Sequence, residues 1–195
     1  MKNYIKTIAA IMFFSVTFIA CDDDKTELPE QVPSLYYEGF TEAFAFEGWT
    51  NFSQAGTNKW TNEFYEKDDN YYIKFTGFQS NQASNIGWAI TPAINLDLAD
   101  KKRLVFRSAK NHVSSLNNKF ELFVSEDFDG TNVLAATWVP LTFNLPPLSG
   151  TNYAFVNSGV IDLSAYSGMI HLAWKVTGNG STLTGGYEVD SINVF

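Results

Sequence analysis

The sequence predicts an all-β protein that folds as a two-sheet antiparallel β-sandwich, a jelly roll. Apolar and polar residues alternate with a period of two in several short segments, as they do in strands that bury one face. Turn-forming residues separate these segments at the short spacings of antiparallel sheets. No segment after residue 21 carries the long apolar stripe of an amphipathic helix.

The clearest alternation predicts three strands. In the first, Leu104 and Phe106 face one way while Arg103 and Arg107 face the other. The same pattern predicts strands over 119–124 and 170–176, and turns are predicted at 68–70, 127–130, 146–147, 149–150 and 178–180. Trp174 falls on the apolar face of its strand, which predicts a core position for the ring.

The first residues have the pattern of a bacterial lipoprotein signal. Lys2 and Lys6 precede an apolar run over 8–20 that is too short to span a bilayer as a helix. Residues 18–21 read Phe-Ile-Ala-Cys and resemble a lipobox, in which the cysteine becomes lipidated after cleavage. We therefore predict a signal peptide over 1–21 with lipidation at Cys21. The alternative is an uncleaved apolar anchor.

An acidic segment follows the predicted lipidation site. Asp22, Asp23 and Asp24 resemble the surface-export signal of Bacteroidetes lipoproteins, which implies an outer-membrane protein that is lipid-anchored and exposed on the cell surface. The alternative is that they only begin a hydrated tether. Residues 22–36 are predicted to form this flexible acidic tether, and 37–195 the sandwich domain.

Charge and composition narrow the possible partners. The chain has 13 basic and 21 acidic residues, and removing Lys2 and Lys6 with the signal leaves 11 against 21, about ten negative charges. A nucleic-acid partner is not expected, because a phosphate backbone requires a basic face. The only cysteine is Cys21, so packing must stabilise the domain, and 17 Phe, 9 Tyr and 5 Trp are available for its core.

Several ordered motifs resemble the choice-of-anchor J or cleaved-adhesin family, MAM-like jelly rolls of Bacteroidetes surface proteins. The resemblance covers about residues 40–195. It is carried by Glu42-Ala43-Phe44, Gly48-Trp49, Trp60, Trp88-Ala89-Ile90-Thr91-Pro92-Ala93-Ile94, Ser125-Glu126-Asp127-Phe128-Asp129-Gly130, residues 158–168 and the closing Tyr187-Glu188-Val189-Asp190-Ser191-Ile192-Asn193-Val194. The family fold agrees with the sandwich predicted from the alternation.

The resemblance implies a structural calcium ion where the first and last strands meet. The corresponding carboxylates are Glu42 and Asp190, with Glu188 as a further ligand, although Ala43 and Ser191 depart from the family pattern. Ca²⁺ takes six to eight oxygen ligands, so loop carbonyls would complete such a site. The segment 127–130 begins like a calcium loop, but an aspartate-capped turn is the simpler interpretation.

No catalytic constellation is evident, and we predict that the protein is not an enzyme. His112 and His171 have no spaced partner for a metal or a nucleophile. Glu188 and Asp190 resemble the alternating carboxylates of retaining jelly-roll glucanases. Strict alternation would place Ile192 at the next position on that face, so the carboxylate pair is incomplete.

Exposed aromatic residues are the candidates for ligand binding. Tyr65, Tyr71 and Tyr72 lie in segments where polar and aromatic residues are interleaved, which predicts loops that can stack on sugar rings. Trp138 is undecided between packing and binding. The predicted function is a non-catalytic, surface-anchored lipoprotein that binds a glycan or a surface protein. The alternatives are a small glycoside hydrolase and a structural or adhesive subunit of a surface complex.

Overall fold

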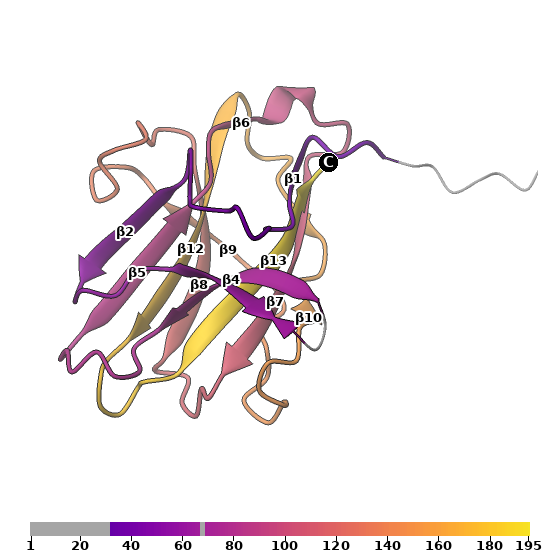
Figure 1. Ribbon diagram of the computed structural model, residues 1–195. Coiled ribbons are helices and arrows are strands. Elements are labelled where there is room, and N and C mark those ends of the chain that lie inside the picture. Colours follow the sequence, from indigo (N-terminus) through magenta and orange to yellow (C-terminus); the bar gives the residue numbers. More distant parts are fainter. Residues whose placement is uncertain (1–31, 67–68) are drawn as a thin grey trace, which may run out of the picture. The chain divides into compact units, whose positions relative to one another are not determined.

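The structure, a computed structural model, describes residues 32–66 and 69–195 (Figure 1). The predicted signal peptide, the lipidation of Cys21 and most of the predicted tether lie outside the described residues, as does Asp68 of the first predicted turn. The chain enters the first sheet at Tyr36, just before the predicted start of the domain at residue 37.

Two antiparallel sheets pack face to face, which confirms the predicted all-β sandwich. The seven-stranded sheet has the order β10-β7-β13-β4-β3, with β1 beside β13 and β11 beside β7. Its strands are β1 (Tyr36–Glu38), β3 (Thr61–Tyr65), β4 (Asn70–Thr76), β7 (Arg103–Asn111), β10 (Val156–Asn157), β11 (Ile161–Asp162) and β13 (Gly186–Val194). The long strands β7 and β13 lie side by side at its centre (Figure 1).

The six-stranded sheet has the order β2-β5-β12-β8-β9, with β6 beside β12. Its strands are β2 (Thr50–Ala55), β5 (Asn85–Ile90), β6 (Ile94–Asn95), β8 (Lys119–Ser125), β9 (Val139–Leu141) and β12 (Met169–Gly178), and a short 3-10 helix, η2 (Leu96–Leu98), follows β6. No helix within 32–66 or 69–195 has the length and apolar character needed to cross a membrane.

The core fills the space between the sheets and is rich in aromatic rings. Trp174 is fully buried, as its strand position predicts, and its ring lies 5.4 Å from that of Phe106 and 6.3 Å from that of Trp49. The sheets approach closely where Gly87 of β5 lies under the ring of Phe75 of β4, since a Cβ at residue 87 would overlap that ring. A side chain at position 87 would therefore push the sheets apart.

A second hydrophobic cluster covers the outer face of the six-stranded sheet. Trp88 of β5 packs there against Phe128 and Val133 of the loop that joins β8 to β9, and not in the space between the sheets. Trp138 completes this cluster, with its ring 5.4 Å from that of Trp88 and 5.4 Å from that of Phe128. The sandwich thus has two apolar layers, one between its sheets and one outside them.

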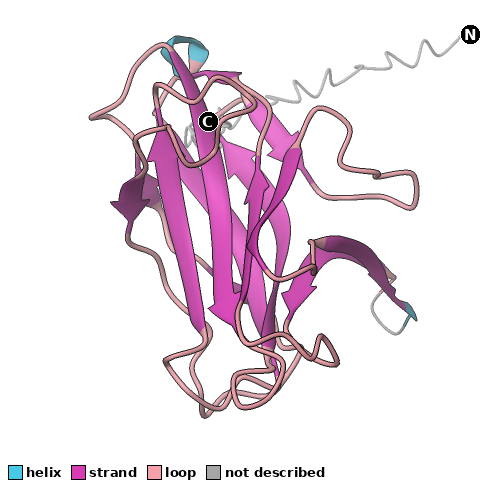
Figure 2. Ribbon diagram, turned by 90° about the vertical axis from the view of Figure 1, so that its left-hand side faces the viewer, coloured by secondary structure: helices cyan, strands magenta, loops and turns pink. Residues whose placement is uncertain are grey.

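Two local predictions from the sequence are wrong. The segments that contain Tyr65 and Tyr72 are not loops but the paired strands β3 and β4, a hairpin that projects from the body of the sandwich (Figure 2). Strict alternation also fails in β13, because a β-bulge follows Asp190 and Ser191 adopts a positive φ of 52°. The bulge turns Ile192 into the core, where it is fully buried.

Candidate functional site

The outer face of the seven-stranded sheet carries an unusual set of polar and aromatic side chains. The register pairs Glu188 of β13 with Lys74 of β4 on one side and with Ala109 of β7 on the other. It also pairs Asp190 with Arg107. Since Tyr187 and Val189 point into the core, these outward positions alternate with core residues as the pleat requires.

Glu188 lies at the centre of this face and has no solvent-exposed surface. Tyr72 of β4 and Phe155, which precedes β10, meet with ring centroids 5.7 Å apart. We call this pair the aromatic bridge. Because β7 and β13 lie between β4 and β10, the bridge spans both strands on the face that holds Glu188.

The carboxyl group of Glu188 is chemically unsatisfied. Neither oxygen has a hydrogen-bond partner of good geometry within the described chain. Burial raises the pKa of Glu188 to about 7, while the positive charge of Lys74 and the side chain of Asn111 act to lower it and the negative charge of Glu63 acts to raise it. Burial therefore favours a neutral acid near pH 6.

Asp190 has a different role from Glu188 despite sharing its face. Its carboxylate accepts hydrogen bonds from the backbone N–H of Ser191 (2.6 Å) and from the Ser191 hydroxyl (2.9 Å), and so closes the bulge. It also accepts a hydrogen bond from Asn70 (3.4 Å) and lies 3.8 Å from the Arg107 guanidinium. Asp190 thus stabilises the bulge in β13.

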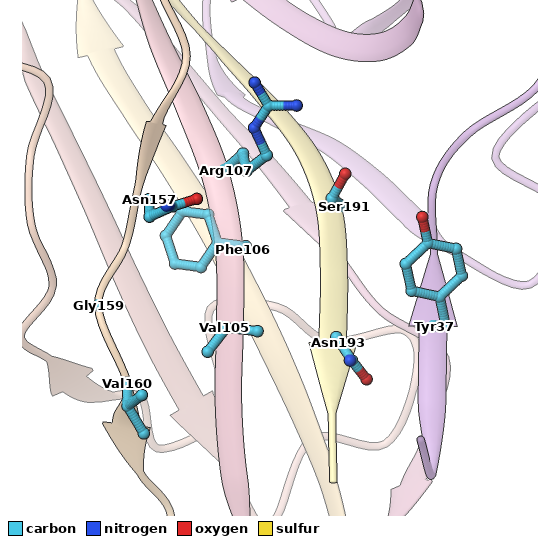
Figure 3. A pocket seen from close by; sticks show the side chains of 9 residues that line it. All are labelled: Tyr37, Val105, Phe106, Arg107, Asn157, Gly159, Val160, Ser191 and Asn193. Carbon is cyan, nitrogen blue, oxygen red and sulfur yellow. The ribbon is translucent and has the colours of Figure 1, made fainter. Parts of the chain in front are cut away.

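A groove of about 460 Å³ runs across the bulge, and we call it the Tyr37 groove (Figure 3). Figure 3 shows Tyr37 on one side of strands β7 and β13 and Asn157 on the other, with Ser191 and Asn193 between them. The groove is lined by Tyr37, Val105, Phe106, Arg107, Asn157, Gly159, Val160, Ser191 and Asn193. Tyr37 is 62% exposed and Val160 64% exposed, so the groove offers an aromatic ring, an apolar wall, amides and a guanidinium to solvent.

A second cavity, of about 500 Å³, lies at the other end of β7, and we call it the Tyr153 cavity. It is lined by Lys74, Thr76, Phe78, Asn111, His112, Tyr153 and Thr184. Tyr153 is held over the sheet because its backbone N–H donates to the carbonyl of Lys110 and its hydroxyl lies 3.3 Å from His112 Nδ1. The two cavities lie on the same sheet face as the aromatic bridge.

The predicted calcium ligands are not gathered into one group. The described ranges contain no set of three or more His, Cys, Asp or Glu side chains placed to hold a metal ion. Glu188 and Asp190 are buried on the outer face, whereas Glu42 is exposed in the loop before β2. In the segment 127–130, Asp129 accepts hydrogen bonds from the N–H groups of Thr131 and Asn132, the arrangement of an aspartate-capped turn.

The predicted ligand-binding aromatics are divided among three environments. Tyr65 is 39% exposed on β3, and Tyr72 forms half of the aromatic bridge. Tyr71 points to the core side, packs against the main cluster and lies 4.6 Å from the ring of Phe64. Trp138 belongs to the second cluster, where its indole N–H donates to the carbonyl of Val133. Only Tyr65 and Tyr72 therefore lie on the candidate face.

The histidines and carboxylates considered as catalytic candidates lie in different environments. His171 Nδ1 lies 2.8 Å from the carbonyl oxygen of Thr91, which links β12 to the residue after β5, and the ring packs edge-on against Phe128. His112 lines the Tyr153 cavity, a role that its sequence environment did not indicate. Glu188 and Asp190 are both at most 1% exposed, so neither presents its carboxyl group on an open surface.

Three groove residues were missed by the sequence analysis. Tyr37 was assigned to the start of the domain, and Asn157 lies in a segment with no distinct pattern. Arg107 was recognised only as the polar side of a strand. Their proximity depends on pairings of β1 with β13 and of β10 with β7, which join segments far apart in the sequence. No local signal could have identified them as one site.

Comparison with solved structures supports the fold assignment. The chain is similar to the K1 cleaved adhesin domain of Lys-gingipain from Porphyromonas gingivalis W83, with a TM-score of 0.53, 14% identity and coverage of 82% of this chain and 96% of that one. For the K2 cleaved adhesin domain of Lys-gingipain the TM-score is 0.54, at 14% identity, with 82% and 98% covered. No protein-family model and no curated protein sequence matches the chain.

A carbohydrate-binding module has a similar fold. This module, TmCBM27, is described as recognising mannan, and it aligns with a TM-score of 0.50 and 11% identity over 84% of this chain and 97% of its own. The chain therefore has the β-sandwich fold shared by adhesin domains and carbohydrate-binding modules. At this level of identity the comparison defines the fold, while the ligand depends on the chain's own residues.

Proposed function

We propose that this protein is a non-catalytic glycan-binding or adhesion module carried on the cell surface by a lipid anchor. The observation that carries the proposal is the Tyr37 groove, an exposed strip of aromatic, apolar and amide groups on the outer face of the seven-stranded sheet. The cleaved adhesin domains and the mannan-recognising module share its β-sandwich fold, which is consistent with either form of binding.

The groove has the chemistry that a sugar chain requires. The ring of Tyr37 can stack on the apolar face of a pyranose, and Val160 extends the apolar surface. The side chains of Asn157 and Asn193 can donate hydrogen bonds to hydroxyl groups and accept them. A few convergent polar groups beside an apolar wall are typical of small-ligand sites.

The anchor is proposed from the sequence alone. Cys21 after an apolar run, followed by three aspartates, supports lipidation and export to the outer surface of the outer membrane. The protein would then contact the membrane only through its lipid. The net negative charge argues against nucleic acid as a partner.

A glycan array probed with residues 22–195 tests the proposal, with calcium present and absent. We expect binding to at least one glycan and a loss of about tenfold or more in Tyr37→Ala and in Asn157→Ala. Leu116→Ala is the control, since Leu116 is 68% exposed and does not line the groove. The array contradicts the glycan proposal if no glycan binds, or if both groove variants bind as well as the wild type.

Adhesion to a protein is the second candidate function. It is favoured by the exposure of Tyr37 and Val160 at the groove and by the similarity of the fold to cleaved adhesin domains. A protein partner would also lose affinity in Tyr37→Ala, but it would bind without any glycan. Binding that survives complete deglycosylation of the partner distinguishes adhesion from glycan recognition.

A further inference from the structure

The Tyr153 cavity is lined by several hydrogen-bond donors. Lys74 has an ammonium group with three donors, and it forms an ion pair with one Glu63 oxygen at 3.3 Å. The hydroxyl of Tyr153 and the imidazole of His112 line the same space. His112 Nδ1 lies 2.7 Å from Asn111 Oδ1, so Nε2 is the ring nitrogen left for a ligand, and it donates to a carboxylate in the imidazolium form.

A second lysine lies close to the cavity. The ammonium group of Lys110 is buried behind the cavity wall, where it donates to Asn152 Oδ1 at 2.7 Å. The same oxygen accepts the backbone N–H of His112, so this charge lies close to the cavity. Glu63 forms an ion pair with Lys74. A protein with a formal net charge of −8 thus places two lysines at one cavity.

The described residues that line the cavity include one lysine and no carboxylate. Glu188 lies behind the same wall, and its carboxyl group has no exposed surface, so it does not enter the cavity. A carboxylate in the cavity would therefore meet the Lys74 ammonium without a competing acidic side chain in the lining.

The two rings of the cavity are positioned by their contact with each other. They meet edge to face with centroids 5.6 Å apart. His112 and Tyr153 have positive φ values of 56° and 66°, as do seven other non-glycine residues within the described ranges.

We propose that the Tyr153 cavity binds an acidic sugar, a hexuronic acid residue, with its carboxylate at Lys74 and His112 and its ring against Tyr153. This inference rests on the proposed glycan-binding function and specifies a ligand class for a second site on the same face. The cavity volume of about 500 Å³ lies within the range of small-ligand sites. A carboxylate would share the Lys74 ammonium with Glu63, whose exposed pairing is weak and readily exchanged.

Matched ligands that differ only in charge provide the test. ¹⁵N-labelled residues 22–195 are titrated at pH 6 with the methyl glycosides of glucuronate, galacturonate and mannuronate, and with the neutral methyl ester of each. We expect at least one acid to bind about tenfold more tightly than its ester, since a charged hydrogen bond is lost in the ester. Backbone amide signals of His112, Tyr153 and Thr184 should shift.

Two lysine variants give a matched control. Lys74→Met should lower affinity for the acid about tenfold and leave affinity for the ester unchanged, whereas Lys175→Met should change neither. The two lysines are comparable, with side chains 22% and 20% exposed and each beside a strand glutamate. Should Lys74→Met fail to fold, His112→Asn serves instead, because asparagine tolerates a positive φ.

The outcomes separate this inference from the proposed function. Equal binding of acid and ester, shifts confined to the Tyr37 groove, or an unaffected Lys74→Met variant would each overturn the acidic-sugar site. If neutral glycans still bind on the array in those cases, the proposed function stands alone. If neither acids nor neutral glycans bind, both are wrong. If an acidic sugar binds at the cavity and no neutral glycan binds on the array, the inference is supported and the function is restricted to acidic glycans.

Discussion

Glu188 is a carboxylic acid on the same sheet face as the aromatic bridge, without exposed surface or a good hydrogen-bond partner. Such a group destabilises a folded protein when it is ionised, because the charge has lost its water. The same sheet face carries the Tyr37 groove and the Tyr153 cavity. Proteins often break such local rules of stability at functional sites.

Glu188→Gln is expected to stabilise the protein at pH 8 and to flatten its pH dependence. The pKa of Glu188 is raised from 4.5 to about 7 on folding, so its contribution is most favourable below pH 4.5 and is lost as pH rises to 7. The difference corresponds to roughly 3 kcal/mol. Urea unfolding at pH 4.5 and pH 8 measures it, with Glu121→Gln as control. Parallel wild-type and Glu188→Gln profiles would contradict the assignment.

Asp190 closes the bulge in β13, and its replacement tests both this structural role and the calcium prediction. Asp190→Ala should lower the free energy of unfolding by about 1–3 kcal/mol without calcium, because the N–H and hydroxyl of Ser191 lose their acceptor. If the calcium prediction is also right, calcium will raise the melting temperature of the wild type but not of the variant. If neither calcium nor a chelator changes the melting temperature of the wild type, the calcium prediction is wrong and Asp190 has only its structural role.

At the scale of elements, the loop between β8 and β9 acts as a third layer. It brings Phe128, Val133 and Trp138 over the outer face of the six-stranded sheet, where Trp88 is 4% exposed. Trp88 belongs to the motif over 88–94, and its ring is buried outside the space between the sheets, because β5 turns it away from the facing sheet.

Trp88→Ala is expected to cost about 3–5 kcal/mol of stability, since its large ring leaves a cavity against Phe123 and Trp138. Tyr65→Ala, at a 39% exposed position, should change stability by less than about 1 kcal/mol. Tyr71→Ala should cost more than Tyr65→Ala, because Tyr71 packs against the core. Chemical denaturation measures all three, and a Trp88→Ala variant as stable as Tyr65→Ala would refute the third layer.

At the scale of the whole molecule, the remaining prediction concerns the lipid anchor. Cys21→Ser should abolish acylation and move the protein from the membrane fraction to the soluble fraction, because the acyl chains supply the anchoring energy. Metabolic labelling with palmitate and fractionation after an alkaline wash measure both effects. A Cys21→Ser protein that still carries label or stays with the membrane would exclude the lipoprotein assignment.

The fold class can be predicted from local sequence. Alternation in 103–108, 119–124 and 170–176 corresponds to β7, β8 and β12, since a strand that buries one face must alternate. The same pattern places Trp174 in the core. It fails at the hairpin β3–β4, where interleaved polar and aromatic residues resemble a loop although β4 lies between β3 and β13 in the sheet.

The candidate site is assembled by contacts between segments far apart in the sequence. The Tyr37 groove joins β1, β7, β13 and the segment after β10, and the aromatic bridge joins Tyr72 to Phe155 across two strands. These contacts follow from strand order and from the bulge at Ser191, which are set by long-range pairing and leave no local periodicity. Local sequence fixes which face of a strand is apolar, whereas non-local packing decides which outward residues become neighbours.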